Sequence, residues 1–254
     1  MRVLLAGLTF LLVTPTIGGL VFLAALLRLP DRDGSIYDWG PRVWARAMLW
    51  AGGVRLQLHH PERIAQDAAR IYVSNHVSYY DVFALAAVLP RYKWIAKAEL
   101  LRIPIFGSAA RAAGMIFIER HNRKAAFAQY QKAAECIHQG ASVIVCPEGT
   151  RGDHYGLRAF KKGPFVLAIA SGVPIVPTVV YGTREVLPRG SWRMRRGVVH
   201  IHFLEEISTC GYRYDERNVL ARLTWDRMAD ALHETYGIAS EMSRHREAAE
   251  VASA

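Results

Sequence analysis

The chain has 254 residues, of which 52% are hydrophobic, a length that accommodates one sizeable domain with an accessory segment and excludes a second large catalytic domain. Its net charge of +10 favours an anionic partner: a phospholipid surface, a nucleic acid, or an acidic cofactor or carrier. The three cysteines, Cys136, Cys146 and Cys210, are odd in number and far apart, which excludes a disulfide framework or a paired zinc motif and fits a reducing compartment.

The N-terminus predicts a membrane segment. No charged residue lies between Val3 and Leu27, and a helix of this length would extend about 37 Å, against a hydrocarbon core of about 30 Å. The stretch is too long for a cleaved signal peptide, and no clean cleavage site follows it. Pro15, Gly18 and Gly19 lie near its middle, so we expect either a kinked span or a broken hairpin that enters one leaflet.

Charges around this segment predict its orientation. Arg28, Arg32, Arg42 and Arg46 follow it, whereas only Arg2 precedes it. Because basic residues stay on the cytoplasmic side of a membrane, we expect the rest of the chain to lie there.

A second, amphipathic helix is expected to begin at Pro41 and to end near Gly52. Three tryptophans lie in it or beside it: Trp39, Trp44 and Trp50. Tryptophans next to arginines suit the lipid headgroup layer, although Trp44 and Met48, at helical spacing, fit a protein core equally well. Residues 1–53 are therefore predicted to form a membrane-anchoring helical segment.

Residues 54–236 alternate strand-like and helical runs, which predicts an α/β domain with a largely parallel mixed sheet flanked by helices. We expect strands at 71–74, 94–96, 115–118, 142–146, 175–181 and 198–204, and helices at 81–89, 124–138, 163–171 and 215–236. Pro174 and Pro177 in one apolar strand indicate an edge or bulged strand, which would wall an apolar groove or simply belong to the core. Residues 237–254 are predicted to form a polar tail, which is either a frayed helix or a disordered segment.

The first candidate site is a histidine and a carboxylate five positions apart, His76 and Asp81, after an apolar strand. On one helix they would face about 140° apart, so His76 belongs in a turn and Asp81 in the first turn of the next helix. A histidine held by a carboxylate can take a proton from an alcohol at neutral pH. Alternatively, Asp81 only stabilises the helix N-terminus, with Ser78 in a capping box, and His76 is a loop histidine.

Two further segments carry charge at strand ends. Residues 114–120 predict a strand that delivers Arg120 to its end, although a strand that simply ends in charge has the same pattern. After Pro147, a glycine turn brings backbone amides, a hydroxyl and a guanidinium together, which is a good anion site. Its residues are Glu148, Gly149, Thr150 and Arg151.

We expect no metal. None of the ten histidines falls in a metal-binding helix motif. His200 and His202 alternate on a predicted strand, so they are expected to line a half-exposed face rather than hold an ion.

The order and spacing from His76 through Arg120 and Glu148-Gly149-Thr150-Arg151 to Pro177 resemble the lysophosphatidic acid acyltransferases, a branch of the glycerolipid acyltransferase superfamily. The resemblance covers about residues 54 to 205. The segment Lys97-Ala98-Glu99-Leu100 also looks like the family, as do Pro104 and Phe106-Gly107, and the N-terminal segment is similar to the helical motif of small bacterial members. The chain departs from the family pattern at two positions: Cys146 stands where an aromatic residue is usual, and Gly152 stands where a serine is common. Neither departure removes a charged group, so they would affect the fit of the acyl chain or the rigidity of the turn.

The resemblance implies transfer of an acyl group from a thioester, acyl-CoA or acyl-acyl carrier protein, to the sn-2 hydroxyl of lysophosphatidic acid, giving phosphatidic acid at the cytoplasmic face of the cell inner membrane without a cofactor. His76 would be the general base, oriented by Asp81. Arg120 and Arg151, with Lys97, would hold the acceptor phosphate, and Glu148, Gly149 and Thr150 would belong to the acceptor site.

Two alternatives remain open. The same chemistry could act on another lysolipid, such as lyso-ornithine lipid or a lysophospholipid with a larger headgroup. The second alternative is a non-catalytic, membrane-tethered protein that binds lipid or nucleic acid. It leaves the pairing of His76 with Asp81 unexplained. We expect no nucleic-acid partner. Four arginines around Trp192 suit an anionic leaflet or an acidic carrier protein, or form a solvated loop: Arg189, Arg193, Arg195 and Arg196.

Overall fold

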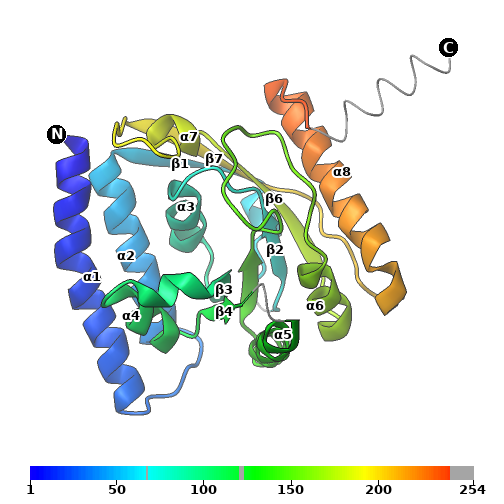
Figure 1. Ribbon diagram of the computed structural model, residues 1–254, viewed down its shortest axis with the longest axis horizontal. Coiled ribbons are helices and arrows are strands. Elements are labelled where there is room, and N and C mark those ends of the chain that lie inside the picture. The colour runs from blue at the N-terminus through cyan, green and yellow to red at the C-terminus, as the bar shows by residue number, and fades with distance from the viewer. Residues whose placement is uncertain (67, 120–122, 241–254) are drawn as a thin grey trace.

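The structure is a computed structural model that describes residues 1–66, 68–119 and 123–240. Within them, a seven-stranded sheet lies between two groups of helices, with strand order β1-β7-β6-β2-β5-β3-β4 (Figure 1). The strands are β1 (Val54–His59), β2 (Ile71–Ser74), β3 (Tyr92–Lys97), β4 (Ile116–Ile118), β5 (Ser142–Val145), β6 (Ile175–Tyr181) and β7 (Gly197–Phe203). The helices are α1 (Arg2–Leu26), α2 (Ile36–Gly52), α3 (Tyr80–Val88), α4 (Phe106–Ala112), α5 (Arg123–His138), α6 (Gly163–Ser171), α7 (Thr183–Val186) and α8 (Arg217–Tyr236).

The sheet is mixed and largely parallel, as predicted: among the described strands, β6 and β7 form the antiparallel ladder and the other ladders are parallel. Both faces are buried, because alternate residues of a central strand enter different cores. In β2, Ile71 and Val73 pack toward the side of α5, α6 and α8, while Tyr72 packs toward α2 and α3. The helix at 163–171 and the strands at 71–74 and 175–181 have the predicted bounds.

Of the edge or bulged strand expected at Pro174 and Pro177, the edge position is wrong, because β6 lies between β7 and β2. A bulge is present, because the register shifts by one residue between the pair Thr178–Phe203 and the bridge Ile175–Ile207. Pro177 lies opposite Val73 of β2, and the continuous ladder with β7 begins only at Thr178. The carbonyl of Pro177 accepts a hydrogen bond from the amide of Leu204 (2.9 Å) on the β7 side. Its missing N–H therefore falls where that ladder has ended, and a proline is tolerated inside the sheet.

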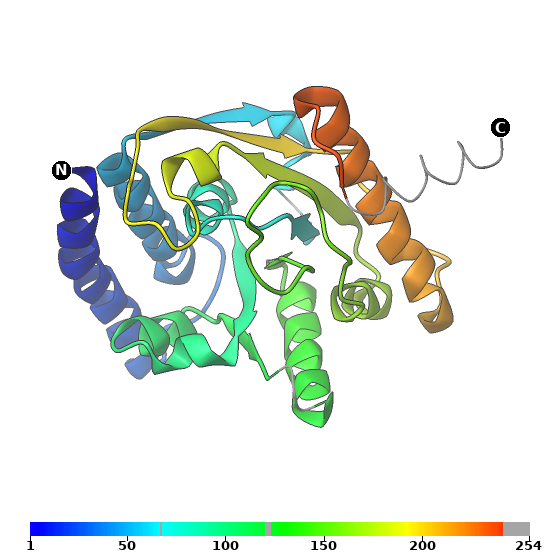
Figure 2. The ribbon, with the colours of Figure 1, turned by 45° about the horizontal axis from the view of Figure 1, so that its top comes forward.

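Helices α1 and α2 run antiparallel, side by side, along one flank of the domain (Figures 1 and 2). Helix α1 is continuous through Pro15, Gly18 and Gly19, so a hairpin broken within this segment is wrong, and the hairpin forms instead between α1 and α2. By length and composition, α1 is the described helix that is able to cross a membrane. Leucines such as Leu4 and Leu11 cover its outer face.

Helix α2 begins at Ile36, after Ser35, rather than at Pro41. Pro41 lies in its second turn, where it removes a single intrahelical bond. The alternative of a core role holds for Trp44, which packs edge-on against Phe83 at 5.0 Å between ring centroids and donates a hydrogen bond to Thr14 (2.9 Å). Trp50, in contrast, is 68% exposed.

The predicted polar tail begins with a packed segment. Ser240 is buried, and its hydroxyl accepts a hydrogen bond from the amide of Leu157 (3.0 Å). Residues 241–254 of this tail lie outside the described residues.

Candidate active site

The predicted site residues follow strands that are parallel neighbours. Strands β2, β5, β3 and β4 pair in parallel, so their C-terminal ends meet at one edge of the sheet, where open α/β sheets bind ligands. His76 follows β2, Glu148 follows β5, and Lys97 ends β3. The topology therefore brings segments far apart in the sequence to a common edge.

His76 and Asp81 form the pair that their spacing predicts. The Nδ1 atom of His76, in the loop after β2, lies 2.9 Å from Oδ2 of Asp81 in the first turn of α3. The Asp81 side chain is fully buried, and that of His76 is 18% exposed. Because a carboxylate can only accept, Nδ1 carries the proton, and Nε2 keeps a lone pair that can accept a proton from a substrate.

Asp81 is held by three further donors. Its Oδ2 accepts from the amides of Val77 (2.7 Å) and Ser78 (2.8 Å), and its Oδ1 accepts from the hydroxyl of Thr183, at the start of α7. The capping alternative and the catalytic one are therefore compatible, because one carboxylate closes the turn and faces the imidazole. The expected capping box is only partly formed, since the Ser78 hydroxyl accepts from the amide of Tyr80 (3.3 Å).

Glu148 lies behind the histidine. Its Oε1 accepts from the amide of His76 (3.2 Å), and its Oε2 accepts from Nε of Arg158 (3.1 Å). Burial raises the pKa of Glu148, and the Arg158 guanidinium opposes this effect. Both oxygens have protein partners, so the geometry indicates that Glu148 positions the backbone of His76.

The turn after Glu148 is hydrogen-bonded to the loop that carries His76. Gly149 has a φ of 81°, which a glycine adopts without strain. The amide of Gly152 donates to the carbonyl of His76 (2.7 Å), and the carbonyl of Thr150 accepts from Arg158. The histidine loop and the glycine turn therefore form one hydrogen-bonded unit.

Arg151 stacks on Tyr79, with its guanidinium carbon 3.7 Å from the ring centroid. Tyr79 is 53% exposed and lies between His76 and Asp81 in the sequence. A stacked guanidinium keeps its N–H groups in its own plane, where they can bind an anion. The stacking therefore holds a cation against Tyr79, three residues after His76.

A second predicted cation, Lys97, lies farther along the edge of the sheet. Lys97 is half-buried at the end of β3, two strands from β2 and thus about 10 Å away across the sheet. Arg120 lies outside the described residues; its neighbour Glu119, just after β4, is exposed.

Thr183 and Arg158 were missed by the sequence analysis. Thr183 meets Asp81 across 102 positions, and Arg158 meets Glu148 across 10 positions within a loop. Neither contact could be predicted from the sequence, because no hydrophobic periodicity or motif links the two residues of each pair.

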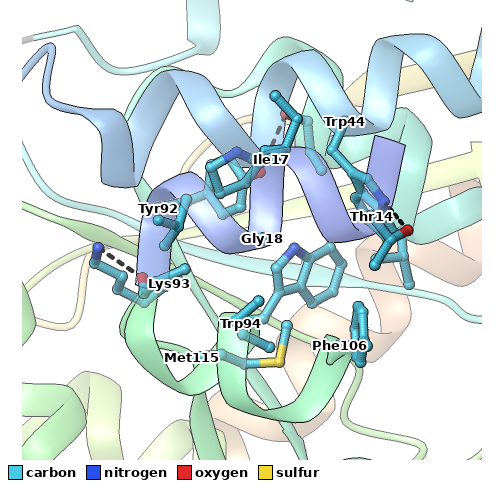
Figure 3. Close-up of a pocket in the computed structure, with 16 residues that line it drawn as sticks. Thr14, Ile17, Gly18, Trp44, Tyr92, Lys93, Trp94, Phe106 and Met115 are labelled. Atoms are coloured by element: carbon cyan, nitrogen blue, oxygen red, sulfur yellow. Dashed lines mark hydrogen bonds between the residues drawn. The ribbon is translucent and has the colours of Figure 1, made fainter. Parts of the chain in front are cut away.

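An apolar cavity of about 100 Å³ lies between the N-terminal helices and the domain. Figure 3 shows side chains of α1, α2, β3 and α4 around it, among them Ile17, Trp44, Trp94 and Phe106. Val82, next to Asp81 in α3, also lines it. The cavity lining thus includes the residue that follows Asp81 in the sequence.

The sheet carries a histidine–carboxylate pair after β2 and a glycine turn after its neighbour β5, and this part of the chain matches a known enzyme family. Residues 55–181 match the family model described as Acyltransferase. The chain is 30% identical over 218 residues to 1-acyl-sn-glycerol-3-phosphate acyltransferase of Haemophilus influenzae, with 85% of this chain and 88% of that protein covered. It is 33% identical over 201 residues to the human beta form, with 77% and 71% covered. The chain therefore belongs to the acyltransferase family.

Plant relatives are longer. A chloroplastic 1-acyl-sn-glycerol-3-phosphate acyltransferase of Brassica napus is 36% identical over 127 residues, which are 50% of this chain and 37% of that protein. The chain thus spans little more than a third of such relatives. The crystal structure of the acyltransferase PlsC from Thermotoga maritima has a TM-score of 0.75 at 24% identity, with 95% of this chain and all of that chain covered. This likeness confirms the predicted fold.

Proposed function

We propose that this protein transfers an acyl group from an acyl thioester to the sn-2 hydroxyl of lysophosphatidic acid, giving phosphatidic acid. The observation that carries the proposal is the 2.9 Å contact of His76 Nδ1 with Asp81, which leaves Nε2 free as a base. The names of the Haemophilus influenzae and human relatives support this choice of acceptor.

In the proposed reaction, Nε2 of His76 takes the proton of the acceptor hydroxyl as its oxygen attacks the thioester carbonyl. The new C–O bond forms, the C–S bond breaks, and the imidazolium returns the proton to the thiolate. Asp81 keeps the proton on Nδ1 and stabilises the imidazolium. The reaction needs no cofactor, because acyl-CoA or acyl-acyl carrier protein is a co-substrate.

The acceptor phosphate would bind Arg151, with Lys97 and Arg120 as further cations. The position of Arg151 on Tyr79, beside the histidine loop, supports this role. Gly149 and Thr150 would shape the acceptor site, and Glu148 would contribute by holding the amide of His76.

The acyl chain would occupy the apolar cavity. The cavity lining is almost entirely apolar, with Ile17 and Val21 from α1, and Val82 and Ala86 from α3. Because Val82 adjoins Asp81, a chain seated there would lie next to the reacting carbonyl. The carbonyl would then face Nε2 of His76.

We also propose that α1 enters one leaflet of the inner membrane from the cytoplasmic face. Its inner face packs on α2 and α4, which a separately spanning helix would not do, and its outer face carries exposed leucines. The loop with Trp192, which is 86% exposed, lies near the start of α1 (Figures 1 and 2). Its arginines would contact anionic headgroups.

The test uses purified protein with lysophosphatidic acid, lysophosphatidylcholine and lyso-ornithine lipid, each with both donor types, and mass spectrometry of the products. We expect phosphatidic acid as the main product and a loss of about 10² to 10⁴-fold in kcat in the His76→Ala variant, with unchanged circular dichroism. Full activity in the folded variant would contradict the mechanism. A preference for lyso-ornithine lipid would identify the alternative acceptor.

A further inference from the structure

Three histidines outside the active site meet at the other side of the sheet. His59 ends the edge strand β1, and His200 and His202 lie on β7. The parallel register pairs His59 directly with His202, and His200 is two residues away on the same face. All three are half-buried, so the expectation that His200 and His202 line a half-exposed face is confirmed. The sequence analysis missed His59, because its strand was not predicted.

The donor atoms of these histidines are close enough to share one ion. One ring nitrogen from each side chain lies within 4.8 Å of the others, and Nε2 of His59 is 3.1 Å from Nδ1 of His200. A tetrahedral zinc ion with bonds of about 2.0 to 2.1 Å needs donors about 3.3 Å apart. The widest gap would therefore close by at most about 1.5 Å. The rings of His59 and His202, which stack at 4.0 Å with an interplanar angle of 2°, would have to turn so that their lone pairs converge on the ion.

The protonation of the cluster suits a metal. The 3.1 Å contact between Nε2 of His59 and Nδ1 of His200 requires a proton that the two nitrogens share. A metal ion bound to both nitrogens would replace this proton. The hydroxyl of Tyr236, 2.6 Å from Nε2 of His202, can accept its proton and leave Nδ1 free as a ligand.

We propose that His59, His200 and His202 bind one zinc ion, with water at the fourth position. Three imidazoles favour zinc or a similar first-row metal over magnesium or calcium. The ion would join β1, which follows the N-terminal helices directly, to β7, and Tyr236 would connect the site to α8. Its role would be structural and separate from the chemistry at His76.

The test is a titration of full-length, untagged, metal-stripped protein in detergent with Co²⁺, followed by displacement with Zn²⁺. We expect visible absorption bands that saturate at one equivalent and disappear with Zn²⁺. His59→Gln, His200→Gln and His202→Gln should each weaken Zn²⁺ affinity at least about tenfold. Zn²⁺ should raise the melting temperature of the wild type and not that of these variants.

Two controls separate this site from others. His60 is exposed and pairs with Glu62 at 3.0 Å, so His60→Gln should bind Zn²⁺ like the wild type, and so should His76→Ala. The proposal is overturned if binding is not saturable at one equivalent, or if the His59→Gln variant, folded by circular dichroism, retains wild-type affinity. Loss of binding in His76→Ala would assign the ion to the active site instead and overturn it equally.

Discussion

The hydroxyl of Thr183 donates a hydrogen bond to the Oδ1 atom of Asp81, and both side chains are fully buried. Because Oδ2 faces His76 and two amides, this contact satisfies the one carboxylate oxygen that points away from the imidazole. The orientation of the His76 imidazole thus depends on a helix more than a hundred residues downstream.

Thr183→Val should therefore leave a buried carboxylate oxygen without a donor. We expect it to lower the free energy of unfolding by about 1 to 3 kcal/mol and to reduce kcat, measured by denaturant unfolding and steady-state kinetics. Thr183→Ser keeps the hydroxyl and should restore both. Equal defects in the two variants would show that packing of the methyl group matters rather than the hydrogen bond.

Asp81→Asn tests what the negative charge contributes. The amides of Val77 and Ser78 should keep a carbonyl oxygen toward His76, so the tautomer is retained and only the stabilisation of the imidazolium is lost. We expect kcat to fall at least about tenfold, though less than in His76→Ala. The double variant should be no slower than His76→Ala, because the two residues act as one unit. Additive losses would show that Asp81 acts independently of the histidine.

Arg151→Lys should raise the KM for lysophosphatidic acid, because lysine cannot make a two-pronged contact with phosphate. Arg151→Ala should cost about 1.5 to 3 kcal/mol, or roughly ten- to hundredfold in kcat/KM. The matched control is an acceptor without phosphate, lyso-ornithine lipid, for which the loss should be much smaller. Equal losses for both acceptors would assign Arg151 to the structure of the loop through its stacking on Tyr79.

Glu148 should give a pH-dependent contribution to stability. Burial raises its pKa above the usual value of about 4.5, so the folded state binds this proton more tightly than the unfolded chain. Its contribution is fully present below the unfolded pKa and is lost as pH rises through the folded pKa. We expect the melting temperature of the wild type, relative to Glu148→Gln, to fall as pH rises from about 4.5 toward neutrality. A constant difference would contradict the assigned shift.

The outer face of α1 should determine membrane partition. Leu8 and Leu12 are 54% and 60% exposed, so replacing both with Asp should release protein from vesicles while preserving activity on detergent-dispersed substrate. Val219 on α8, 57% exposed, lies across the domain, and Val219→Asp is the matched control. Unchanged partition of the double variant would assign anchoring to α2 or the loop around Trp192.

The sequence predicted the elements whose signal is local. Strand β2 and helix α6 had clear apolar runs, and the spacing of His76 and Asp81 placed them on a turn and a helix. Strand β1 was missed although it has six residues, because it lies at the edge of the sheet and its partner β7 lies about 140 positions later. The edge position predicted for β6 from its prolines was wrong, because β6 lies inside the sheet and Pro177 is accommodated where the pairing with the β7 segment is bulged. Thr183 and Arg158 reach the site through tertiary contacts that no local pattern encodes.

Gly18 of α1 has a further consequence. A Cβ atom at this position would lie 2.9 Å from the Cβ of Ala109 in α4, so only glycine permits this close approach. Gly18 also lines the apolar cavity, whereas Leu20 and Phe22 on the same helix are exposed. In the proposed complex, the wall between the bound acyl chain and the surrounding lipid would thus be a single helix thick. Evolution of chain-length preference and of bilayer attachment would be tied together, because each substitution in this helix alters the same wall from one side or the other.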